Sequence, residues 1–288
     1  MMKDFSSHCK TTRIILLFIL LLFSLSAPAQ LIRVENQEEF VDSIKNELDY
    51  GPYFGLYKDN YFTIGTSIGH QRPSRTNSDV KFQISIAQRL TKATLPWHTY
   101  IYLFFSQKVM WNVFEPSMPM RDLNFNPGIG WSKPFFIKNR YVGKLTLILE
   151  HESNGRDSIQ SRSWNKISLS GSVLVSDFLM VHSKFWIPIV DSGNNRDILK
   201  YSGIWQSGFE VSLKDRKFIF GATFVKRRGW NLNFNTILEF SWRIYKKSNQ
   251  YLFFQYYNGY GENLLDYNQF HSRLRAGIVI KPKFFSEF

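Results

Sequence analysis

From Asn60 onward, the chain consists of segments of about ten residues separated by turn-forming residues. Within many segments, apolar residues alternate with polar or small ones, as in the pattern of Val80, Phe82, Ile84 and Ile86 against Lys81, Gln83, Ser85 and Ala87. Residues 273–281 show the same alternation near the end of the chain. Because a strand places successive side chains on opposite faces, this pattern predicts an all-β fold.

The apolar face of such strands points either to the core of a soluble sandwich or to lipid around a barrel. Aromatic residues make up 17% of the chain, with 27 Phe and 14 Tyr. Transmembrane barrels carry aromatic girdles at both membrane interfaces, so this content favours a barrel. No uninterrupted apolar stretch after Gln30 reaches the roughly 20 residues that a spanning helix needs. If the chain crosses a membrane, it must do so as a barrel.

We therefore expect a transmembrane antiparallel β-barrel in a bacterial outer membrane, forming one domain over residues 59–288. About twelve strands are predicted, an even number as in bacterial single-chain barrels. They start near residues 60, 78, 98, 121, 142, 161, 178, 203, 217, 232, 249 and 271. The chain ends in an aromatic residue, Phe288, which is common in proteins inserted into this membrane.

The first thirty residues have the organisation of a secretory signal peptide. Basic residues precede the apolar run 14–25, and the small residues 27–29 follow it. This run is shorter than a membrane-spanning helix of roughly 20 residues. We expect residues 1–29 to be a cleaved signal peptide and residues 30–58 to be an N-terminal leader or plug. Cys9 is the only cysteine, so the processed chain would have neither a disulfide nor a cysteine metal site.

The chain is basic, with 36 Lys and Arg against 23 Asp and Glu and a formal net charge of +13. A basic exported protein could bind nucleic acid, or it could lie among anionic lipid head groups. The barrel pattern favours the second alternative, and we expect no nucleic-acid partner.

One predicted hairpin places polar residues on an apolar face. In residues 144–152 the odd positions 145, 147 and 149 are leucines, and His151 and Ser153 continue that face. A turn centred near Ser158 sets Asn165 opposite His151. The cross-strand pairs are then residues 153 and 163, 151 and 165, and 149 and 167. All three polar side chains then lie on the leucine face.

These three residue types can form a nucleophile, a base and a group that orients the base. A serine hydroxyl is a poor nucleophile until a neighbouring base removes its proton, and the base needs a third group to fix its tautomer. An isolated His-x-Ser is better explained as a polar entrance to a loop at the barrel rim. Asn165 on the same face favours the catalytic interpretation. Glu152 points to the opposite, lumenal face, where we expect a structural role.

The same residues resemble the signature of the outer membrane phospholipase A family. The resemblance is carried by residues 151–156 and 161–165, including the fourteen-residue spacing from His151 to Asn165. Residues 259–268 resemble the penultimate-loop motif of that family, and further similarity lies at residues 80–83, 107–108 and 121–127. The resemblance as a whole runs from about residue 58 to near the C-terminus.

The resemblance implies a twelve-stranded barrel that hydrolyses acyl esters of glycerophospholipids and lysophospholipids as a calcium-dependent phospholipase A1/A2. Carried over by position, Ser153 is the nucleophile, His151 the base and Asn165 the residue that orients the imidazole. Gly155 would supply a backbone N–H to the oxyanion.

The resemblance also implies a homodimer in the active state, with Ca²⁺ bound near the oxyanion site at the dimer interface. The matching calcium ligands are the Ser161 hydroxyl and the Arg156 carbonyl of one subunit, with the Ser117 carbonyl of the other. Gln107 matches a residue that hydrogen-bonds across the dimer inside the membrane. Membrane phospholipids are the expected substrate.

Two alternatives remain at this point. A non-enzymatic outer-membrane pore or structural barrel could retain the motif, and it would conduct small solutes if its lumen were open. A soluble secreted β-sandwich esterase would remain in the aqueous phase without detergent. Acyl-position and head-group preference, calcium affinity and the trigger of dimerisation do not follow from the sequence.

Overall fold

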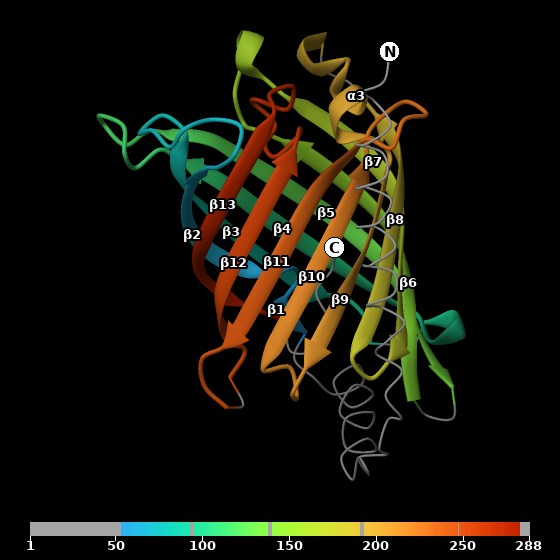
Figure 1. Cartoon of the computed structure of the whole chain (residues 1–288). Helices are drawn as coiled ribbons and strands as arrows, with labels where there is room; N and C mark the ends of the chain where they lie inside the picture. Colours follow the sequence, from blue (N-terminus) through green and yellow to red (C-terminus); the bar gives the residue numbers. More distant parts are fainter. Residues whose placement is uncertain (1–52, 93–94, 138–139, 191–192, 247, 283–288) are drawn as a thin grey trace, which may run out of the picture. The chain divides into compact units, whose positions relative to one another are not determined.

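The chain folds into a closed barrel of antiparallel strands (Figure 1). A computed structural model of it describes residues 53–92, 95–137, 140–190, 193–246 and 248–282. The strands are β1 (Phe54–Leu56), β2 (Asn60–Ser67), β3 (Ser78–Arg89), β4 (Tyr100–Trp111), β5 (Met120–Ile137), β6 (Arg140–Ser153), β7 (Ser163–Ser176), β8 (Leu179–Ile189), β9 (Trp205–Leu213), β10 (Phe218–Lys226), β11 (Phe234–Arg243), β12 (Gln250–Gly259) and β13 (His271–Ile280). The short helices are η1 (Pro96–His98), η2 (Ser158–Gln160), η3 (Gly193–Asn195) and α3 (Ile198–Ser202).

Strands β2 to β13 each pair with the next strand along the chain, and β13 pairs with β2 to close the ring. Among the described residues this gives twelve strands around the barrel. The short β1 also pairs with β3, along the part of β3 that extends past its pairing with β2. The predicted fold class is confirmed, and each predicted strand start lies within two residues of the observed one.

The N-terminal predictions fall largely outside the described residues. The signal peptide 1–29, Phe288 and most of the leader 30–58 are not described. The described part of the leader contains β1, which pairs with β3. No helix in the described ranges is long and apolar enough to cross a membrane.

The outer face of the barrel is apolar, as the two-residue alternation predicts. On β6, Leu145, Leu147 and Leu149 are between 41 and 50% exposed, whereas Thr146 and Ile148 between them are buried. Similar exposed rows continue around the wall, with Ile167 and Leu169 on β7, Phe220 on β10, Leu238 on β11 and Phe254 on β12. An apolar outer surface of this kind is stable against lipid and would be unfavourable in water.

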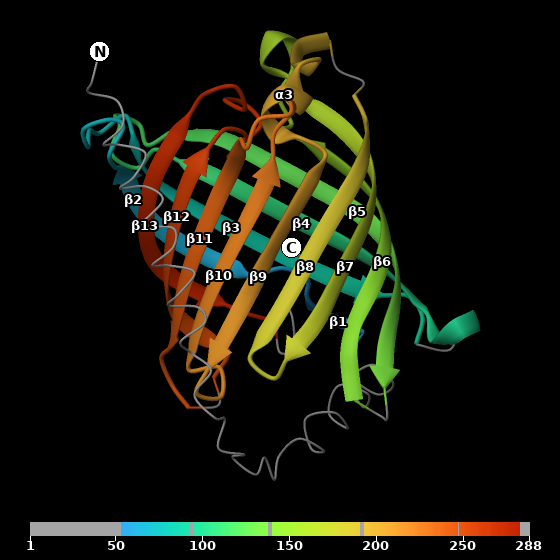
Figure 2. The same cartoon turned by 45° about the vertical axis from the view of Figure 1, so that its right-hand side comes forward.

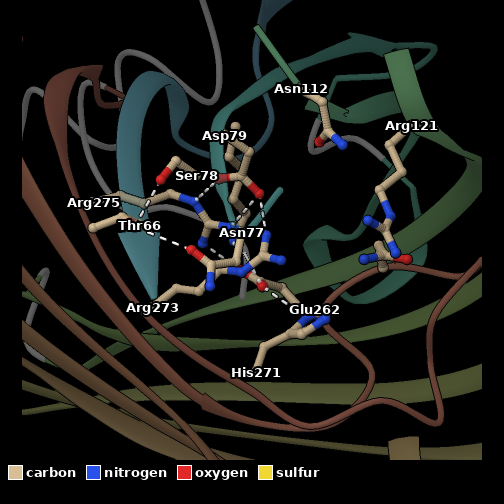
Figure 3. A network of polar contacts seen from close by, with 12 residues as sticks. Thr66, Asn77, Ser78, Asp79, Asn112, Arg121, Glu262, His271, Arg273 and Arg275 are labelled. Atoms are coloured by element: carbon tan, nitrogen blue, oxygen red, sulfur yellow. Dashed lines mark hydrogen bonds and ion pairs between the residues drawn. The ribbon is translucent and has the colours of Figure 1, made fainter. Parts of the chain in front are cut away.

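The interior contains a network of buried ion pairs that joins β3, β13 and the β12–β13 loop (Figure 3). Arg275 on β13 is buried and pairs with both Asp79 on β3 and Glu262 in the β12–β13 loop. Glu262 also accepts from Lys81 at 3.3 Å and lies 3.2 Å from His271 Nδ1. These contacts hold the β12–β13 loop inside the lumen, an arrangement that favours a filled barrel over an open pore.

The two ends of the barrel differ in the length of their connections. At one end, the loops 68–77, 112–119, 154–162, 190–204, 227–233 and 260–270 each have seven or more residues. The other end includes the two-residue turn 177–178 and the four-residue turn 214–217. We call the first the long-loop end; α3 lies there in both views (Figures 1 and 2).

Candidate active site

The β6–β7 hairpin has the register that the sequence predicts. His151 pairs with Asn165, Ser153 with Ser163 and Leu149 with Ile167. His151 Nδ1 lies 2.8 Å from Asn165 Oδ1. Because an amide oxygen only accepts, Nδ1 carries the proton in this contact and the lone pair of Nε2 is left to act as a base.

Ser153 follows two residues after His151 on β6 and therefore lies on the same outward face. Its strand neighbours are Ser163 on β7 and Phe125 on β5. His151, Ser153 and Asn165 are all half-buried. The structure thus places the three predicted triad residues on one outward face at the end of the leucine row, and among the described residues the side-chain hydrogen bond between them is that of His151 with Asn165.

An apolar groove of about 750 Å³ runs along the outer wall from this site. His151 and Asn165 line it, together with apolar residues of five adjacent strands, Leu103, Pro127, Ile129, Leu149, Ile167 and Ile189. Its apolar lining matches an alkyl chain rather than a polar ligand.

The β6–β7 loop, residues 154–162, is closed by one buried side chain. Asn154 donates from Nδ2 to the Gln160 carbonyl at 2.9 Å and accepts at Oδ1 from the Arg162 N–H at 2.9 Å. Its own N–H donates to the Arg162 carbonyl at 3.0 Å. Asn154 belongs to the sequence motif, but the sequence predicted no role for it. A side chain that hydrogen-bonds to the backbone of its own loop leaves no periodic pattern in the sequence.

Gly155 adopts a conformation that favours glycine. Its φ is +62°, in the left-handed region. A Cβ atom at this position would lie 2.9 Å from Phe125 Cε2. A larger residue here would require either the loop or the ring of Phe125, the β5 neighbour of Ser153, to shift.

The residues predicted to hold calcium in one subunit, Arg156 and Ser161, lie in the same loop. The N–H of Ser161 donates to the Ser158 carbonyl at 3.2 Å. Among the described residues, no hydrogen bond uses the Arg156 carbonyl or the Ser161 hydroxyl. These neutral oxygens are ligands of the kind that Ca²⁺ accepts, but two of them fall short of its usual six to eight. The described ranges contain no cluster of three or more His, Cys, Asp or Glu side chains that could hold a metal.

The two remaining predicted residues lie on the neighbouring β4–β5 hairpin. Ser117 is exposed in its loop, with a φ of +65°. Gln107 lies on β4, where its cross-strand neighbours are Ile84 on β3 and Phe125 on β5. It belongs to the outward row that contains Leu103 and Phe105. Ser117 is therefore in a separate loop from Arg156 and Ser161.

The inward-facing residues around the site are structural. Glu152 accepts hydrogen bonds from Trp164 Nε1 and from Lys166 Nζ, both at 2.9 Å. Arg156 donates to Gln160 Oε1 at 2.7 Å and to the Arg121 carbonyl. Glu152 points into the lumen as expected. The Arg156 guanidinium holds its loop together through Gln160 and ties it to β5 through Arg121.

The closed barrel with its apolar outer face defines a transmembrane barrel protein, and His151, Ser153 and Asn165 form a polar cluster on that outer face. A family model described as phospholipase A1 matches residues 54–280, and the chain belongs to this family. The chain is 29% identical over 211 residues to phospholipase A1 of Escherichia coli (strain K12), covering 72% of this chain and 71% of the relative. Phospholipase A1 of Proteus vulgaris is 28% identical over 214 residues.

Two solved structures share the fold. Outer membrane phospholipase A from Escherichia coli superimposes with a TM-score of 0.69 and 25% identity, covering 80% of this chain and 99% of that one. The Salmonella typhi outer membrane phospholipase dimer with bound calcium gives a TM-score of 0.70 and 26% identity, covering 83% and 96%. The resemblance drawn from the sequence is confirmed. The chain is a β-barrel of the bacterial outer membrane that belongs to the phospholipase A1 family.

Proposed function

We propose that the chain hydrolyses acyl esters of membrane phospholipids and lysophospholipids with Ser153, His151 and Asn165, as a calcium-dependent homodimer. The observation that carries this proposal is the 2.8 Å contact between His151 Nδ1 and Asn165 Oδ1 on the outward face. Ser153 lies on the same face, two residues after His151 on β6. An Escherichia coli outer membrane phospholipase A with an asparagine changed to alanine is described as an active-site mutant, which supports a role for an amide in such a site.

The reaction follows from these three groups. His151 Nε2 takes the proton of Ser153 as its oxygen attacks the acyl carbonyl, and the tetrahedral oxyanion forms. His151 then returns the proton to the departing alkoxide, which leaves as the lysophospholipid. Water, deprotonated by the same imidazole, releases the fatty acid from the acyl-enzyme. Asn165 keeps the proton on Nδ1 throughout.

Asn165 differs from the more common aspartate because it carries no negative charge. It therefore stabilises the imidazolium less, and oxyanion stabilisation must contribute more. Gly155 would donate its backbone N–H to the oxyanion. The Arg156 carbonyl and the Ser161 hydroxyl, with Ser117 of the partner subunit, would hold calcium. Bound there, the ion would polarise the ester carbonyl and stabilise the oxyanion.

The position of the site fits a substrate that is the bilayer itself. The groove beside His151 and Asn165 can take one acyl chain from the surrounding lipid. A second copy of the chain would cover the open side of this groove. Gln107 supports such a dimer, because an amide in an apolar outward row is stable only with a hydrogen-bond partner, and a two-fold axis would supply the same side chain from the other subunit.

The test is acyl-ester hydrolysis of phospholipid in mixed micelles by the refolded protein, in calcium and in EDTA. We expect turnover only in calcium, and a fall of about 10⁴-fold or more in Ser153→Ala. Equal turnover of wild type and Ser153→Ala would reject this nucleophile. Acyl-position preference is measured in the same assay from the fatty acids released.

A further inference from the structure

The ladder between β5 and β6 is interrupted beside the predicted catalytic base. Its register, which pairs Phe125 with Ser153, places Pro127 opposite His151. Pro127 and His151 nevertheless form no pair in this ladder, which resumes one position farther along β5. Over the same part of β5, the ladder with β4 continues without a gap. The interruption is therefore confined to the side of β5 that faces the site.

The proline explains the interruption. Proline has no backbone N–H, so Pro127 cannot donate a ladder hydrogen bond to β6. On the other side of β6, the Asn154 N–H donates to the Arg162 carbonyl of the β7 side. Since successive residues of a strand direct their peptide groups to opposite sides, His151 directs its own toward β5. The His151 carbonyl thus faces a residue that cannot serve as its donor.

The side chain of Asn126 supplies the donor from the lumenal side. Its Nδ2 donates to the His151 carbonyl at 2.9 Å and to Glu150 Oε2 at 3.2 Å. A carbonyl and a carboxylate only accept, so the amide nitrogen faces both partners and uses its two hydrogens. Asn126 is half-buried and lines the lumenal cavity of about 320 Å³. It is thus a link between the lumen and the backbone of the site on the outer face.

Glu150, the second partner of Asn126, is itself held firmly. It is buried, accepts from Ser168 Oγ on β7 at 2.7 Å, and forms an ion pair with Lys184 Nζ on β8 at 2.6 Å. Because its carboxylate is fixed by two further strands, it orients the amide of Asn126 toward the His151 carbonyl.

We propose that Asn126 is a positioning residue of the active site, which replaces the donor that Pro127 lacks and fixes the β6 peptide that follows His151. The inference deepens the proposed function and rests on it. Without the amide, the β6 backbone would shift beside Pro127, and the imidazole of His151 would move relative to Ser153. The acyl groove would keep Pro127 and its other apolar residues, so lipid binding would persist.

Asn124 provides a matched control on the same strand. It also points inward, donates from Nδ2 to the Asp122 carboxylate, and accepts from the Leu264 N–H at 3.1 Å. These contacts hold the β12–β13 loop and do not involve the backbone of β6. Asn124→Ala therefore removes an inward amide of β5 without changing the support of His151.

The experiment compares kcat and KM of full-length wild type, Asn126→Ala, Asn124→Ala and Ser153→Ala in saturating calcium, with the thermal unfolding midpoint of each. For Asn126→Ala we expect kcat to fall roughly ten- to a hundredfold with KM nearly unchanged, because the reacting groups are misplaced while lipid binding persists. The labelling rate of Ser153 by a long-chain sulfonyl fluoride should fall in parallel. Asn124→Ala should lower the unfolding midpoint at least as much and leave kcat near the wild-type value.

A substitution of the proline tests the replacement of the donor directly. Pro127→Ala restores a backbone N–H opposite the His151 carbonyl. In the Pro127→Ala background, Asn126→Ala should therefore lower kcat by less than about threefold. A role of Asn126 that is confined to Glu150 would not be rescued, since Glu150 loses the same hydrogen bond in both backgrounds.

Wild-type kcat in Asn126→Ala, the same fall in both asparagine variants, or an equal fall in both backgrounds would overturn the proposal. An inactive Ser153→Ala beside a fully active Asn126→Ala would reject the positioning role alone, whereas an active Ser153→Ala would reject the proposed function itself. If Asn126→Ala does not fold, hydrogen exchange of the wild type, followed by NMR, decides. The side-chain amide protons of Asn126 should exchange as slowly as those of Asn124, and rapid exchange at Asn126 would contradict the proposal.

Discussion

At the scale of single residues, the site depends on one neutral hydrogen bond between an imidazole and an amide. Asn165 Oδ1 selects the tautomer of His151 that leaves Nε2 available for the Ser153 proton. The sequence predicted this pair, because strand alternation and a turn near Ser158 leave one register in which Asn165 is opposite His151. It could not predict Asn154, whose partners are backbone atoms of an irregular loop.

Two substitutions of Asn165 separate orientation from charge. Asn165→Ala removes the acceptor for Nδ1, so the imidazole can rotate or change tautomer, and we expect kcat to fall about a hundredfold. Asn165→Asp keeps the acceptor and adds a negative charge that stabilises the imidazolium, so it should retain most of the activity. Both are measured in calcium on the same lipid. Equal activity of Asn165→Ala and wild type would show that the amide does not orient the base.

Gly155 provides a second test at this scale. Gly155→Ala combines a φ of +62° with a Cβ 2.9 Å from Phe125, so the loop must shift away from Ser153. We expect kcat to fall about tenfold or more, since misplacement on the scale of 1 Å is sufficient for such a loss. The control is Gly229→Ala, which also has a positive φ, +109°, but no atom within 4 Å of the added Cβ. A similar kcat in both variants would argue against a role for the Gly155 backbone.

At the scale of elements, the strands and their connections differ in how well the sequence predicts them. Each strand start was predicted within two residues, because the period of two and the turn residues are local signals. The 190–204 connection has no such signal, and η3 and α3 in it were not predicted. Their positions depend on contacts such as that of Ile198 with Trp164 and Tyr267, which are distant in sequence.

The contact between Tyr267 and Asp197 predicts an alkaline pH dependence for the long-loop end. Burial, and then the hydrogen bond to Asp197, raise the pKa of Tyr267 from 10.0 to about 12. Between these values the unfolded chain loses the proton and the folded chain keeps it, so stability is fully present below about pH 10 and is lost as pH rises toward about 12. Unfolding midpoints measured across this range should fall less steeply in Tyr267→Phe. Identical slopes in the two proteins would contradict this account.

At the scale of the whole molecule, the lumen is held together by buried charges as well as by clusters of buried aromatic and aliphatic side chains. Glu262 links the β12–β13 loop to Arg275, Lys81 and His271. Glu262→Gln would leave Arg275 and Lys81 without full compensation, and we expect a loss of about 3 kcal/mol in the free energy of unfolding. Activity at temperatures well below unfolding should change little, because the site lies on the outer face.

Glu115→Gln, in the β4–β5 loop, is the control for this substitution. Its carboxylate accepts one hydrogen bond, from Asn112 Nδ2 at 2.8 Å, and we expect an effect of about 1 kcal/mol. Urea titrations in detergent measure both variants. If Glu262→Gln is no less stable than Glu115→Gln, the lumenal ion pairs do not stabilise the barrel.

The central claim is that Ser153 is an activated nucleophile on the lipid-facing wall. The most direct measurement treats the refolded protein with a long-chain sulfonyl fluoride, in calcium and in EDTA, and locates the covalent adduct by mass spectrometry of the peptide that contains residues 151–156. The account predicts one adduct on Ser153, formed in calcium and strongly slowed in EDTA and in His151→Ala. An adduct on another residue, or labelling of Ser153 that is equally fast without calcium and without His151, would contradict it.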